Sequence, residues 1–414
     1  MLKNSPIHIT DLRAFSRLAI DATLGLTDVV EGMHHNISRL PGVFGVPTDA
    51  PARGITGFVY RSIRTVTRSV GGGIDGLLEL VTPRALHPAS STGREALLAA
   101  LNGVVGDHLF ARSNPLQIAM RMRRCGQPLE LNREALAQAI PQPTGKIVVL
   151  AHGLCMSDLQ WRRNNHDHGA TLAADAGFTP VYLHYNSGLH ISTNGREFAE
   201  QLEALLQAWP VPVEHLAIIG YSMGGLLARS ACAHARQDGH AWLAQLRDLI
   251  FIGTPHQGSP LERGGNLLDG LLGASPYTAT LSRLGKIRSA GITDLRHANL
   301  ADADWQGRDR FTRDARQRSP VALPQGVRCH AIAGSIAKQA GSLREHLVGD
   351  GLVPLNSALG LHADPERNLG VPKSRQWIGH GMNHLDLLDN PDVYQRISTW
   401  LAVPFSKSFA RADA

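Results

Sequence analysis

Apolar and polar residues change their spacing near residue 146, and this change divides the chain into two parts. Before it, apolar residues recur in steps of three and four, which places them on one face of a helix. One such series runs through Leu12–Met33 and a second through Ile55–Val81. A third helix is predicted over Glu95–Leu109, with an N-cap serine or threonine just before it. Residues 1–140 are therefore predicted to form a helical N-terminal region that lacks strands.

Short apolar runs of strand length alternate with helical segments after Lys146, which is the pattern of a mainly parallel sheet covered on both faces. The predicted strands are Ile147–Ala151, Pro180–Tyr185, Leu216–Gly220, Leu249–Gly253, Val327–Ala333 and Gln376–Ile378. The predicted helices are Gly169–Ala176, Arg196–Trp209, Met223–Ala235 and Asp392–Leu401.

This alternation predicts an α/β domain over residues 141–406. Residues of about 260–324 show no clear strand and are rich in glycine, leucine and arginine. A helical cap inserted into the α/β domain is predicted there. Residues 407–414 form a C-terminal tail.

Composition narrows the class of protein without identifying it. With 43% hydrophobic and 18% charged residues, the 414-residue chain can form a large core, and bulk disorder is not expected. A net charge of +6 is a mild bias at this length, and no nucleic-acid-binding motif accompanies it. Four cysteines without a C-x-x-C pair indicate a reducing compartment. With no secretory signal or membrane-spanning run, the expected location is the cytoplasm, soluble or peripheral to a membrane.

Three arginines share a face beside the second helical series: Arg61, Arg64 and Arg68. A basic amphipathic helix of this kind can lie on an anionic membrane. The alternative, which the pattern favours, is a helical hairpin that packs on the α/β domain and keeps its arginines in water. Peripheral membrane contact through the N-terminal helices stays an open prediction.

The chain carries a G-x-S-x-G motif at Gly220–Gly224, between the apolar run Leu216–Ile219 and the helical run that starts at Leu226. This order of strand, sharp turn and helix is typical of a nucleophile elbow. The glycines two residues before and after Ser222 allow strand and helix to approach where a β-carbon would clash. Ser222 is therefore the predicted nucleophile.

A serine hydroxyl becomes nucleophilic only when a base takes its proton, and an acid has to orient that base. In sites with this elbow the acid follows the serine along the chain and the base comes last. We predict Asp350 as the acid, because two flanking glycines turn its loop back towards the sheet. Asp386 and Asp389 are weaker candidates, because they lie too close in sequence to the predicted base to approach it from a neighbouring loop.

The base is predicted to be His384, which lies between the last predicted strand and the terminal helix. The apolar residues after it can anchor its loop while the imidazole projects into the site. His380 is the rival, and with 20 histidines in the chain the presence of a histidine alone decides nothing.

An oxyanion formed during attack on a carbonyl needs two preorganised N–H donors. One predicted donor is the amide of Met223, the residue after the nucleophile, at the positive end of its helix. The other is the amide of Leu154, in the turn after the first predicted strand. His152, in the same turn, is predicted to hydrogen-bond the loop.

Five ordered blocks together resemble the α/β-hydrolase superfamily, and more narrowly its bacterial triacylglycerol-lipase and GPI-inositol-deacylase-like branch. The blocks are Ala151–Leu154, Gly220–Gly225, Gly253–Ser259, Asp350–Pro354 and Asn383–Leu388.

This resemblance covers about 146–403 and implies an α/β-hydrolase fold with Ser222, Asp350 and His384 as a catalytic triad. It implies a structural role for His256 and no need for a cofactor. Gly153 and Tyr221 are predicted to contact the substrate. Tyr221 stands where lipases commonly have histidine, which blurs the substrate class.

Two further segments have competing interpretations. Asn165–His168 could bind a metal ion, but a short cluster without a distant third ligand is more often the start of a helix, so no metal site is predicted. Tyr185–His190, together with Asn194 and Gly195, is either a substrate-contacting loop at the end of a strand or a turn that caps the following helix.

The sequence thus favours a serine carboxylic-ester hydrolase that acts on lipid-like acyl esters. An acyltransferase or thioesterase with the same triad is the first alternative. The second is a non-catalytic, membrane-associated scaffold, which would be expected to have lost a triad residue or an elbow glycine.

Overall fold

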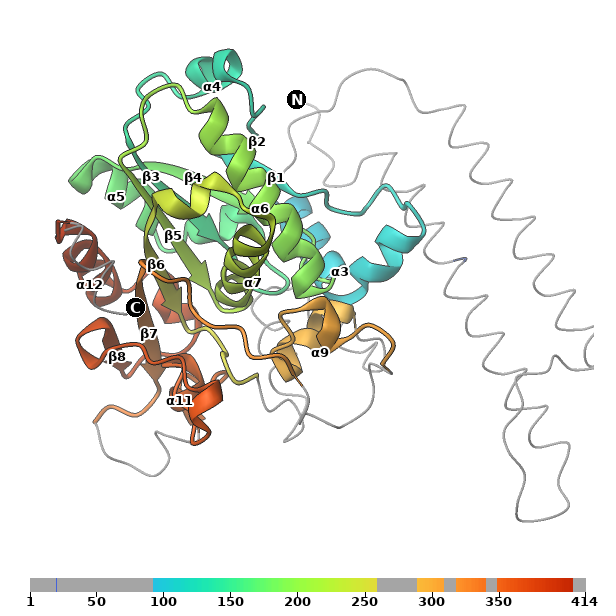
Figure 1. Cartoon of the computed structure of the whole chain (residues 1–414), viewed down its shortest axis with the longest axis vertical. Helices are drawn as coiled ribbons and strands as arrows, with labels where there is room; N and C mark the ends of the chain where they lie inside the picture. Colours follow the sequence, from blue (N-terminus) through green and yellow to red (C-terminus); the bar gives the residue numbers. More distant parts are fainter. Residues whose placement is uncertain (1–19, 21–91, 259–288, 309–317, 340–347, 405–414) are drawn as a thin grey trace, which may run out of the picture. The chain divides into compact units, whose positions relative to one another are not determined.

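A computed structural model describes residue 20 and residues 92–258, 289–308, 318–339 and 348–404 (Figure 1). The two N-terminal helical series, the three arginines beside them, the C-terminal tail and most of the predicted cap lie outside these residues. The chain divides into two units, one of residues 1–94 with 109–117 and one of residues 95–108 with 118–414. The fold described below is that of the second unit.

The second unit is built on one eight-stranded sheet with the order β2-β1-β4-β3-β5-β6-β7-β8. Strands β3 to β8 run parallel to one another, and β1 and β2 are antiparallel additions at one edge. The strands are β1 (Arg121–Arg124), β2 (Gln127–Pro128), β3 (Lys146–Ala151), β4 (Thr179–His184), β5 (His215–Tyr221), β6 (Leu246–Ile252), β7 (Arg328–Ser335) and β8 (Gln376–His380).

All six strands predicted from the sequence are confirmed as β3 to β8, with ends shifted by at most three residues. The prediction that residues 1–140 lack strands is wrong, because β1 and β2 lie there and pair into the same sheet. The sequence of β1 is Arg-Met-Arg-Arg, so one buried methionine is its entire apolar signal. Such a short strand has no apolar run to reveal it.

Helices cover both faces of the sheet. They include α3 (Thr92–Ala111), α4 (Arg133–Ala139), α5 (His168–Ala176), α6 (Ile191–Ala208), α7 (Met223–Asp238), α9 (Ala290–His297), α11 (Leu355–Ala358) and α12 (Pro391–Ala402). The short 3-10 helices are η1 (Asp158–Trp161), η2 (Ala241–Gln245), η5 (Asp302–Asp304), η7 (Pro365–Arg367), η8 (Lys373–Arg375) and η9 (Leu385–Leu388). The four helices predicted after residue 146 are confirmed as α5, α6, α7 and α12. Asn390 caps α12 by accepting a hydrogen bond from the amide of Asp392.

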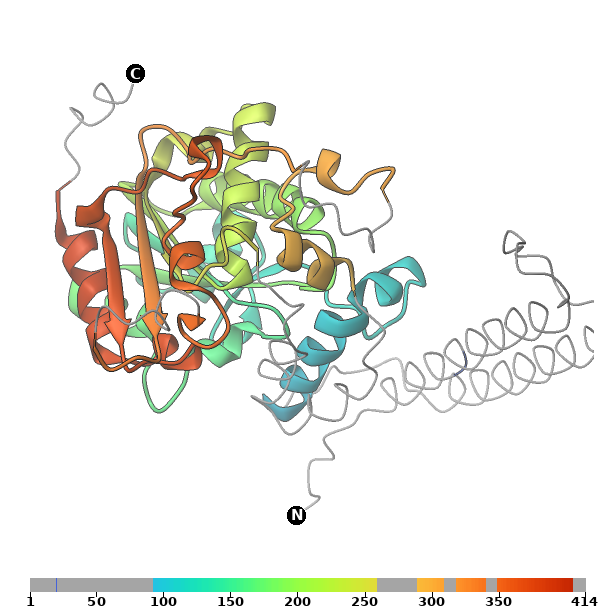
Figure 2. The ribbon, with the colours of Figure 1, turned by 90° about the horizontal axis from the view of Figure 1, so that it is seen from below.

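Alternate residues of the parallel strands enter two separate hydrophobic cores. Ile147 and Val149 of β3 pack with α6 and α7, whereas Val148 and Leu150 pack with α5 and α12. Figure 1 shows these two helix pairs on opposite sides of the sheet, and Figure 2 shows β7, β8 and α12 together at one end of it. The sheet is therefore the middle layer of three. Among the described residues, no helix combines the length and the apolarity needed to cross a bilayer.

The carboxyl ends of the parallel strands meet along one edge of the sheet, here called the carboxyl edge. Ala151 of β3 is in register with Gly220 of β5, and Tyr221 of β5 with Ile252 of β6. From β3 the chain passes to β4 on one side and then to β5 on the other. Ligands of parallel sheets bind at such a reversal, which here lies between the turns that follow β3 and β5.

The opposite edge, where the strands begin, carries a buried charged cluster around Asp248 of β6. Arg328 of β7 donates to both oxygens of its carboxylate, through Nε at 2.9 Å and Nη2 at 2.7 Å. His215 Nε2 lies 2.8 Å from Oδ2, and His330 Nε2 lies 2.9 Å from Oδ1. Burial by itself raises the pKa of Asp248, but hydrogen bonds from these histidines and the arginine outweigh it and lower the pKa below its ordinary value. The cluster ties the first residues of three neighbouring strands together.

Candidate active site

Ser222 occupies the sharp turn between β5 and α7 and adopts a strained backbone conformation. Its φ and ψ are 53° and −121°, a combination that side-chain-bearing residues rarely adopt. Its amide donates to the carbonyl of Ile252 at the end of β6, 2.8 Å away, which fixes the turn to the sheet. The surrounding structure thus holds this serine in the conformation expected of a nucleophile elbow.

The glycines around Ser222 are required by close approaches of the backbone. A β-carbon on Gly220 would lie 2.5 Å from Cα of Gly225, and one on Gly224 would lie 2.1 Å from the carbonyl oxygen of Ala151. A β-carbon on Gly225 would lie 2.0 Å from Oγ1 of Thr254. The steric reason inferred from the sequence for residues 220 and 224 therefore holds, and it extends to Gly225.

Asp350 and His384 are brought together although 34 residues separate them. Oδ2 of Asp350 accepts a hydrogen bond of 2.6 Å from Nδ1 of His384. Its other oxygen, Oδ1, accepts from the amides of Leu352 and Val353, at 3.0 and 2.8 Å. Both side chains are buried. The carboxylate is thus fixed on one side by its own loop and presents the other side to the imidazole.

His384 has one ring nitrogen engaged and the other available. Because Nδ1 carries the proton that it donates to Asp350, Nε2 is left as an acceptor. Nε2 is buried and has no hydrogen-bond partner within the part of the chain that the structure describes, so the hydroxyl of Ser222 is not bonded to it here. Such contacts are often long in unliganded sites and shorten when substrate binds. An unprotonated, unpartnered imidazole nitrogen is what a general base requires.

Tyr221 and Gly253 shape the space around His384. The hydroxyl of Tyr221 donates to the carbonyl of His384 at 3.0 Å, and the two rings lie 4.9 Å apart between centroids. Burial, with the charge of Asp350 adding to it, raises the pKa of Tyr221 well above its ordinary value, so the hydroxyl remains a donor. Gly253 has φ +56°, and a β-carbon there would lie 2.9 Å from the imidazole. Tyr221 and Gly253 thus position His384. That Gly153 and Tyr221 contact the substrate stays a prediction.

The turn after β3 runs directly against the nucleophile. A β-carbon on Gly153 would lie 3.1 Å from Cβ of Ser222. Hydrogen bonds hold the turn on both sides of Leu154: Tyr185 donates to the carbonyl of His152 at 2.8 Å, and the amide of Cys155 donates to Oγ of Ser187 at 3.0 Å.

The two predicted oxyanion donors are the amide of Met223, which follows Ser222, and that of Leu154, which follows Gly153 in the turn against Ser222. None of the hydrogen bonds recorded for the described residues uses the amide of Leu154. Met223 is the first residue of α7, so its amide has no acceptor within the helix and lies at the positive end of the helix dipole. Both amides are free to bind an anion, and their role stays a prediction.

His152, in the same turn, is held neutral. Burial, with repulsion from His184 adding to it, lowers the pKa of His152 to about 3. Its Nδ1 lies 2.8 Å from the carbonyl of Gly153, which accepts the hydrogen bond. This agrees with the structural role predicted for this histidine.

A buried charged cluster beside this turn was not predicted from the sequence. Arg123 of β1 contacts Asp158 at 2.8 Å and Glu95 of α3 at 3.2 Å, and Nδ1 of His184 lies 3.2 Å from Asp158. Burial opposes ionisation of Asp158, but His184 and Arg123 outweigh it and lower its pKa. The cluster fastens α3, β1 and β4 beneath the turn after β3. The alternation of arginine with buried methionine around residue 122 was the signal that could have revealed it.

Helix α3 also packs closely on the loops around the site. A β-carbon on Gly103 would lie 2.2 Å from the sulfur of Cys155, and one on Gly106 would lie 1.9 Å from Oδ1 of Asn186. Nδ2 of Asn186 donates to the carbonyl of Gly106 at 3.0 Å. The loop at Tyr185–His190 therefore connects α3 with the site and leads into α6. Whether it also contacts substrate stays a prediction.

The remaining candidates from the sequence have other partners. Asp386 accepts from the amide of Asn383, and Asp389 contacts Arg163 at 3.2 Å. Asp167 caps α5 by accepting a hydrogen bond from the amide of Ala170. The segment Asn165–His168 therefore forms the start of a helix, as the favoured interpretation of the sequence had it. None of the described residues form a group of three or more acidic, histidine or cysteine side chains able to hold a metal ion.

Part of the chain matches a known family. Residues 142–326, under half of the 414, match the model of the PGAP1-like alpha/beta domain. The matched range contains Ser222, Leu154 and Met223, and it ends before Asp350 and His384. No curated protein matches the chain.

Solved structures of low sequence identity resemble the fold. The mature lipase BlEst2 of Bacillus licheniformis is 17% identical, with a TM-score of 0.41 over 69% of this chain and 98% of its own. Lipase B of Aspergillus fumigatus is 13% identical, with a TM-score of 0.41 over 98% of this chain and 87% of its own. An esterase of Thermogutta terrifontis is 16% identical, with a TM-score of 0.36 over 63% and 90%. Values this low carry no information on the reaction, which has to be argued from the site.

Proposed function

We propose that this chain, which matches the PGAP1-like alpha/beta domain over residues 142–326, belongs to the α/β-hydrolase superfamily and is a serine hydrolase of carboxylic esters. The observation that carries the proposal is the state of His384. Its Nδ1 is bonded to a buried carboxylate, while its Nε2 is buried without a partner on the same sheet edge as a strained serine. His330 at the opposite edge has the same imidazole state, with Nε2 on Asp248 and Nδ1 buried without a described partner, so the strained serine on the same edge is what distinguishes His384.

The proposed reaction begins with attack of Ser222 Oγ on the ester carbonyl carbon while the hydroxyl proton passes to Nε2 of His384. Asp350 holds the imidazole in the required tautomer and stabilises its positive charge. The amides of Leu154 and Met223 bind the oxyanion. When the C–O bond breaks, the leaving alcohol takes the proton from His384, and the acyl group remains on Ser222.

Water then attacks the acyl group, and His384 accepts one of its protons. Collapse of the second tetrahedral intermediate releases the carboxylic acid, and the proton returns to Ser222. Every step uses side chains and amides of this chain, so the proposal requires no cofactor. The preference for lipid-like acyl esters is a prediction from the sequence and is part of what the experiment measures.

The test compares Ser222→Ala with the parent chain on p-nitrophenyl esters with acyl chains of two to twelve carbons. We expect kcat/KM to fall by about 10⁴-fold or more, and labelling by a fluorophosphonate probe to disappear. Ser374→Ala, an exposed serine on η8, is the matched control and should keep both signals. Labelling that persists in Ser222→Ala, or a parent chain that cleaves none of the esters, contradicts the proposal. Recovery of the free acid as the product distinguishes hydrolysis from transfer to an added alcohol.

A further inference from the structure

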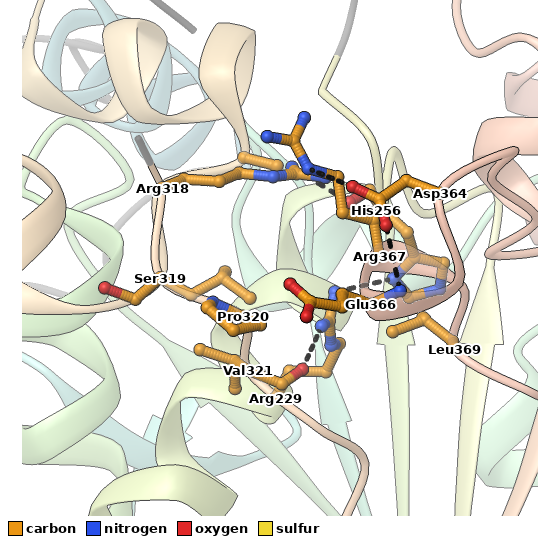
Figure 3. A pocket seen from close by; sticks show the side chains of 12 residues that line it. Arg229, His256, Arg318, Ser319, Pro320, Val321, Asp364, Glu366, Arg367 and Leu369 are labelled. Atoms are coloured by element: carbon orange, nitrogen blue, oxygen red, sulfur yellow. Dashed lines mark hydrogen bonds and ion pairs between the residues drawn. The ribbon is translucent and has the colours of Figure 1, made fainter. Parts of the chain in front are cut away.

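A second polar site lies in a cavity of about 300 Å³ that none of the three triad residues lines (Figure 3). Three arginines line it, and they come from separate parts of the chain: Arg229 from α7, Arg318 from the segment before β7, and Arg367 from η7. We call this site the arginine pocket. His256, Asp364 and Glu366 are among the other residues that line it.

Arg229 is the most buried of the three arginines, with 5% of its surface exposed, and no described carboxylate is bonded to it. Its Nη1 lies 3.3 Å from Nδ1 of His256, and its Nη2 donates to the carbonyl of Val321 at 2.5 Å. Its Nε is buried and has no partner among the residues described. A guanidinium group in this position keeps its full charge and one unused donor inside the protein.

Neighbouring groups add positive charge and do not neutralise Arg229. Burial and then the charge of Arg318 lower the pKa of Arg229 to about 9, so it remains protonated at neutral pH. Burial and the charge of Arg367 lower the pKa of Arg318 in turn. His256 is buried and its pKa lies well below the ordinary value, first because of burial and then because of Arg229 and Arg318. It is therefore neutral and offers no counter-charge.

Arg318 is held in place by neutral acceptors. Its Nη1 lies 3.3 Å from the carbonyls of His256 and His297, and its Nη2 donates to the side-chain oxygen of Gln257. Nε2 of Gln257 donates to the carbonyl of Arg367 at 2.9 Å, which links the two segments that carry these arginines. The guanidinium groups are thus positioned by the fold before any ligand arrives.

The two carboxylates that line the cavity are exposed and lie at the solvent side. Asp364 contacts Arg367 at 3.6 Å, and both residues are substantially exposed. Glu366 is exposed and makes no ion pair within the described residues. These carboxylates offset the charge of Arg367 at the rim. The charge of Asp304 partly opposes the lowering of the pKa of Arg318, whereas no described carboxylate is bonded to Arg229.

We propose that the arginine pocket binds a phosphate-type oxyanion, either inorganic phosphate or the phosphomonoester group of a larger molecule. A tetrahedral dianion offers several acceptors to guanidinium donors that converge from different directions, which is the geometry arginine recognises best. Such a ligand would supply the negative counter-charge that the Arg229 guanidinium lacks. The proposal is independent of the reaction at Ser222, because the two sites share no residue named in either.

The experiment titrates the full-length chain with inorganic phosphate and with glycerol 3-phosphate by isothermal calorimetry, with sodium chloride at matched ionic strength as the blank. We expect saturable binding of one equivalent of at least one phosphate compound. Similar affinities indicate that the free phosphate group suffices, and binding of glycerol 3-phosphate alone indicates a phosphomonoester. Binding of neither compound overturns the proposal.

Variants connect the binding to the pocket. Arg318→Gln, whose side chain is only partly buried, should weaken binding by about tenfold or more, because one charge-assisted hydrogen bond is lost. Arg229→Gln should do the same, and Arg318→Gln keeps the test decisive if Arg229→Gln does not fold. Arg236→Gln, an exposed arginine on the same helix as Arg229, is the matched control and should change the affinity less than twofold.

Glu366→Gln tests whether negative charge at the rim of the pocket opposes anion binding. Removing this rim carboxylate should strengthen phosphate binding, by about threefold for a partly screened charge. Affinity that is unchanged in both Arg318→Gln and Arg229→Gln shows that the anion binds elsewhere and overturns the proposal. If the arginines only hold the segments together, their variants lose thermal stability and the parent chain shows no phosphate binding.

Discussion

The two edges of the sheet each pair a buried aspartate with histidine, and they use the pair differently. At the carboxyl edge, Asp350 binds one histidine at 2.6 Å, and backbone amides occupy its other oxygen. At the opposite edge, Asp248 binds two histidines and both arms of Arg328. The contact between aspartate and histidine is thus nearly the same in both places. What differs is the second partner of each aspartate. Arg328 neutralises the charge of Asp248, whereas only uncharged backbone amides bind the other oxygen of Asp350, so its charge acts on the imidazole.

Backbone φ angles also differ between the two edges of the sheet. Ser222 and Gly253 at the carboxyl edge have φ values of 53° and 56°, whereas every residue with positive φ in the described chain lies outside β6 and β7, the strands that carry Asp248, Arg328 and His330. The backbone of the predicted nucleophile is thus strained, whereas the backbone that carries the Asp248 cluster on β6 and β7 is not. An aspartate–histidine contact is therefore weak evidence of catalysis without a strained nucleophile beside it.

The largest expected effect that separates the two edges is on catalysis. Asp350→Asn should lower kcat by about 10⁴-fold, because the imidazole then loses the partner that fixes its tautomer. The melting temperature should change little, since the amide retains the shape of the carboxylate. Kinetics on a p-nitrophenyl ester and thermal unfolding measure the two quantities. If Asp350→Asn keeps more than a tenth of the parent kcat, the comparison between the edges fails.

The second effect is on stability. Asp248→Asn leaves Arg328 buried without its counter-charge, which should lower the free energy of unfolding by about 3–5 kcal/mol. The kcat per folded molecule should stay unchanged, because the cluster lies at the edge away from Ser222. Urea unfolding gives the stability, and the exposed Asp238→Asn should change it by less than about 0.5 kcal/mol. A loss of kcat without a loss of stability would reverse the roles assigned to the two edges.

Acid should affect His152 and Asp248 in different pH ranges. His152, beside the nucleophile, has a folded pKa of about 3 against about 6.5 when unfolded. The contribution of neutral His152 to the free energy of unfolding is complete above pH 6.5. It is lost as the pH falls, and the loss is about 2 kcal/mol at pH 5. Asp248 has a lowered folded pKa, so its contribution is complete above its unfolded value of about 4 and is lost only below it.

Urea unfolding at pH 7 and pH 5 measures this difference. The parent should lose more stability between the two values than His152→Gln, by about 2 kcal/mol. Equal losses in the two proteins would show that His152 is protonated in the folded state at pH 5.

The smallest expected effect concerns the support of His384. Tyr221→Phe removes the hydrogen bond to the carbonyl of His384, worth about 1 kcal/mol, so kcat should fall about fivefold while KM stays constant. If KM rises and kcat is unchanged, Tyr221 contacts the substrate, as the sequence alone suggested. The ratio of the two parameters therefore decides between positioning and binding.

The sequence predicted the parts of the fold whose signals are local. The six parallel strands are apolar runs, and the elbow at Ser222 is a motif with steric reasons that act within a few residues. Asp350 and His384 could be paired because turns that follow neighbouring parallel strands must meet at one edge. Their bond is a consequence of the pairing of β7 with β8, whereas the alternation of strands and helices indicates only that the sheet is mainly parallel.

The parts that could not be predicted depend on distant partners. Strand β1 is stabilised by pairing with β4 and by ion pairs of Arg123, and its own sequence contains a single buried apolar residue. Arg229 looks like an ordinary helix-forming residue, and only the fold shows that it is buried with no described carboxylate bonded to it. In both cases the deciding interaction joins residues far apart in the chain, and no periodicity records it.

The close packing of α3 against Cys155 and Asn186 has a practical consequence for work on the isolated α/β domain. A version cut at residue 141, where the apolar pattern changes, would lack α3, β1 and β2. It would uncover the buried side chains of Tyr182, on β4, and Cys155, and the turn next to Ser222 would lose the helix on which it rests. A fragment intended to retain activity should therefore begin before Glu95.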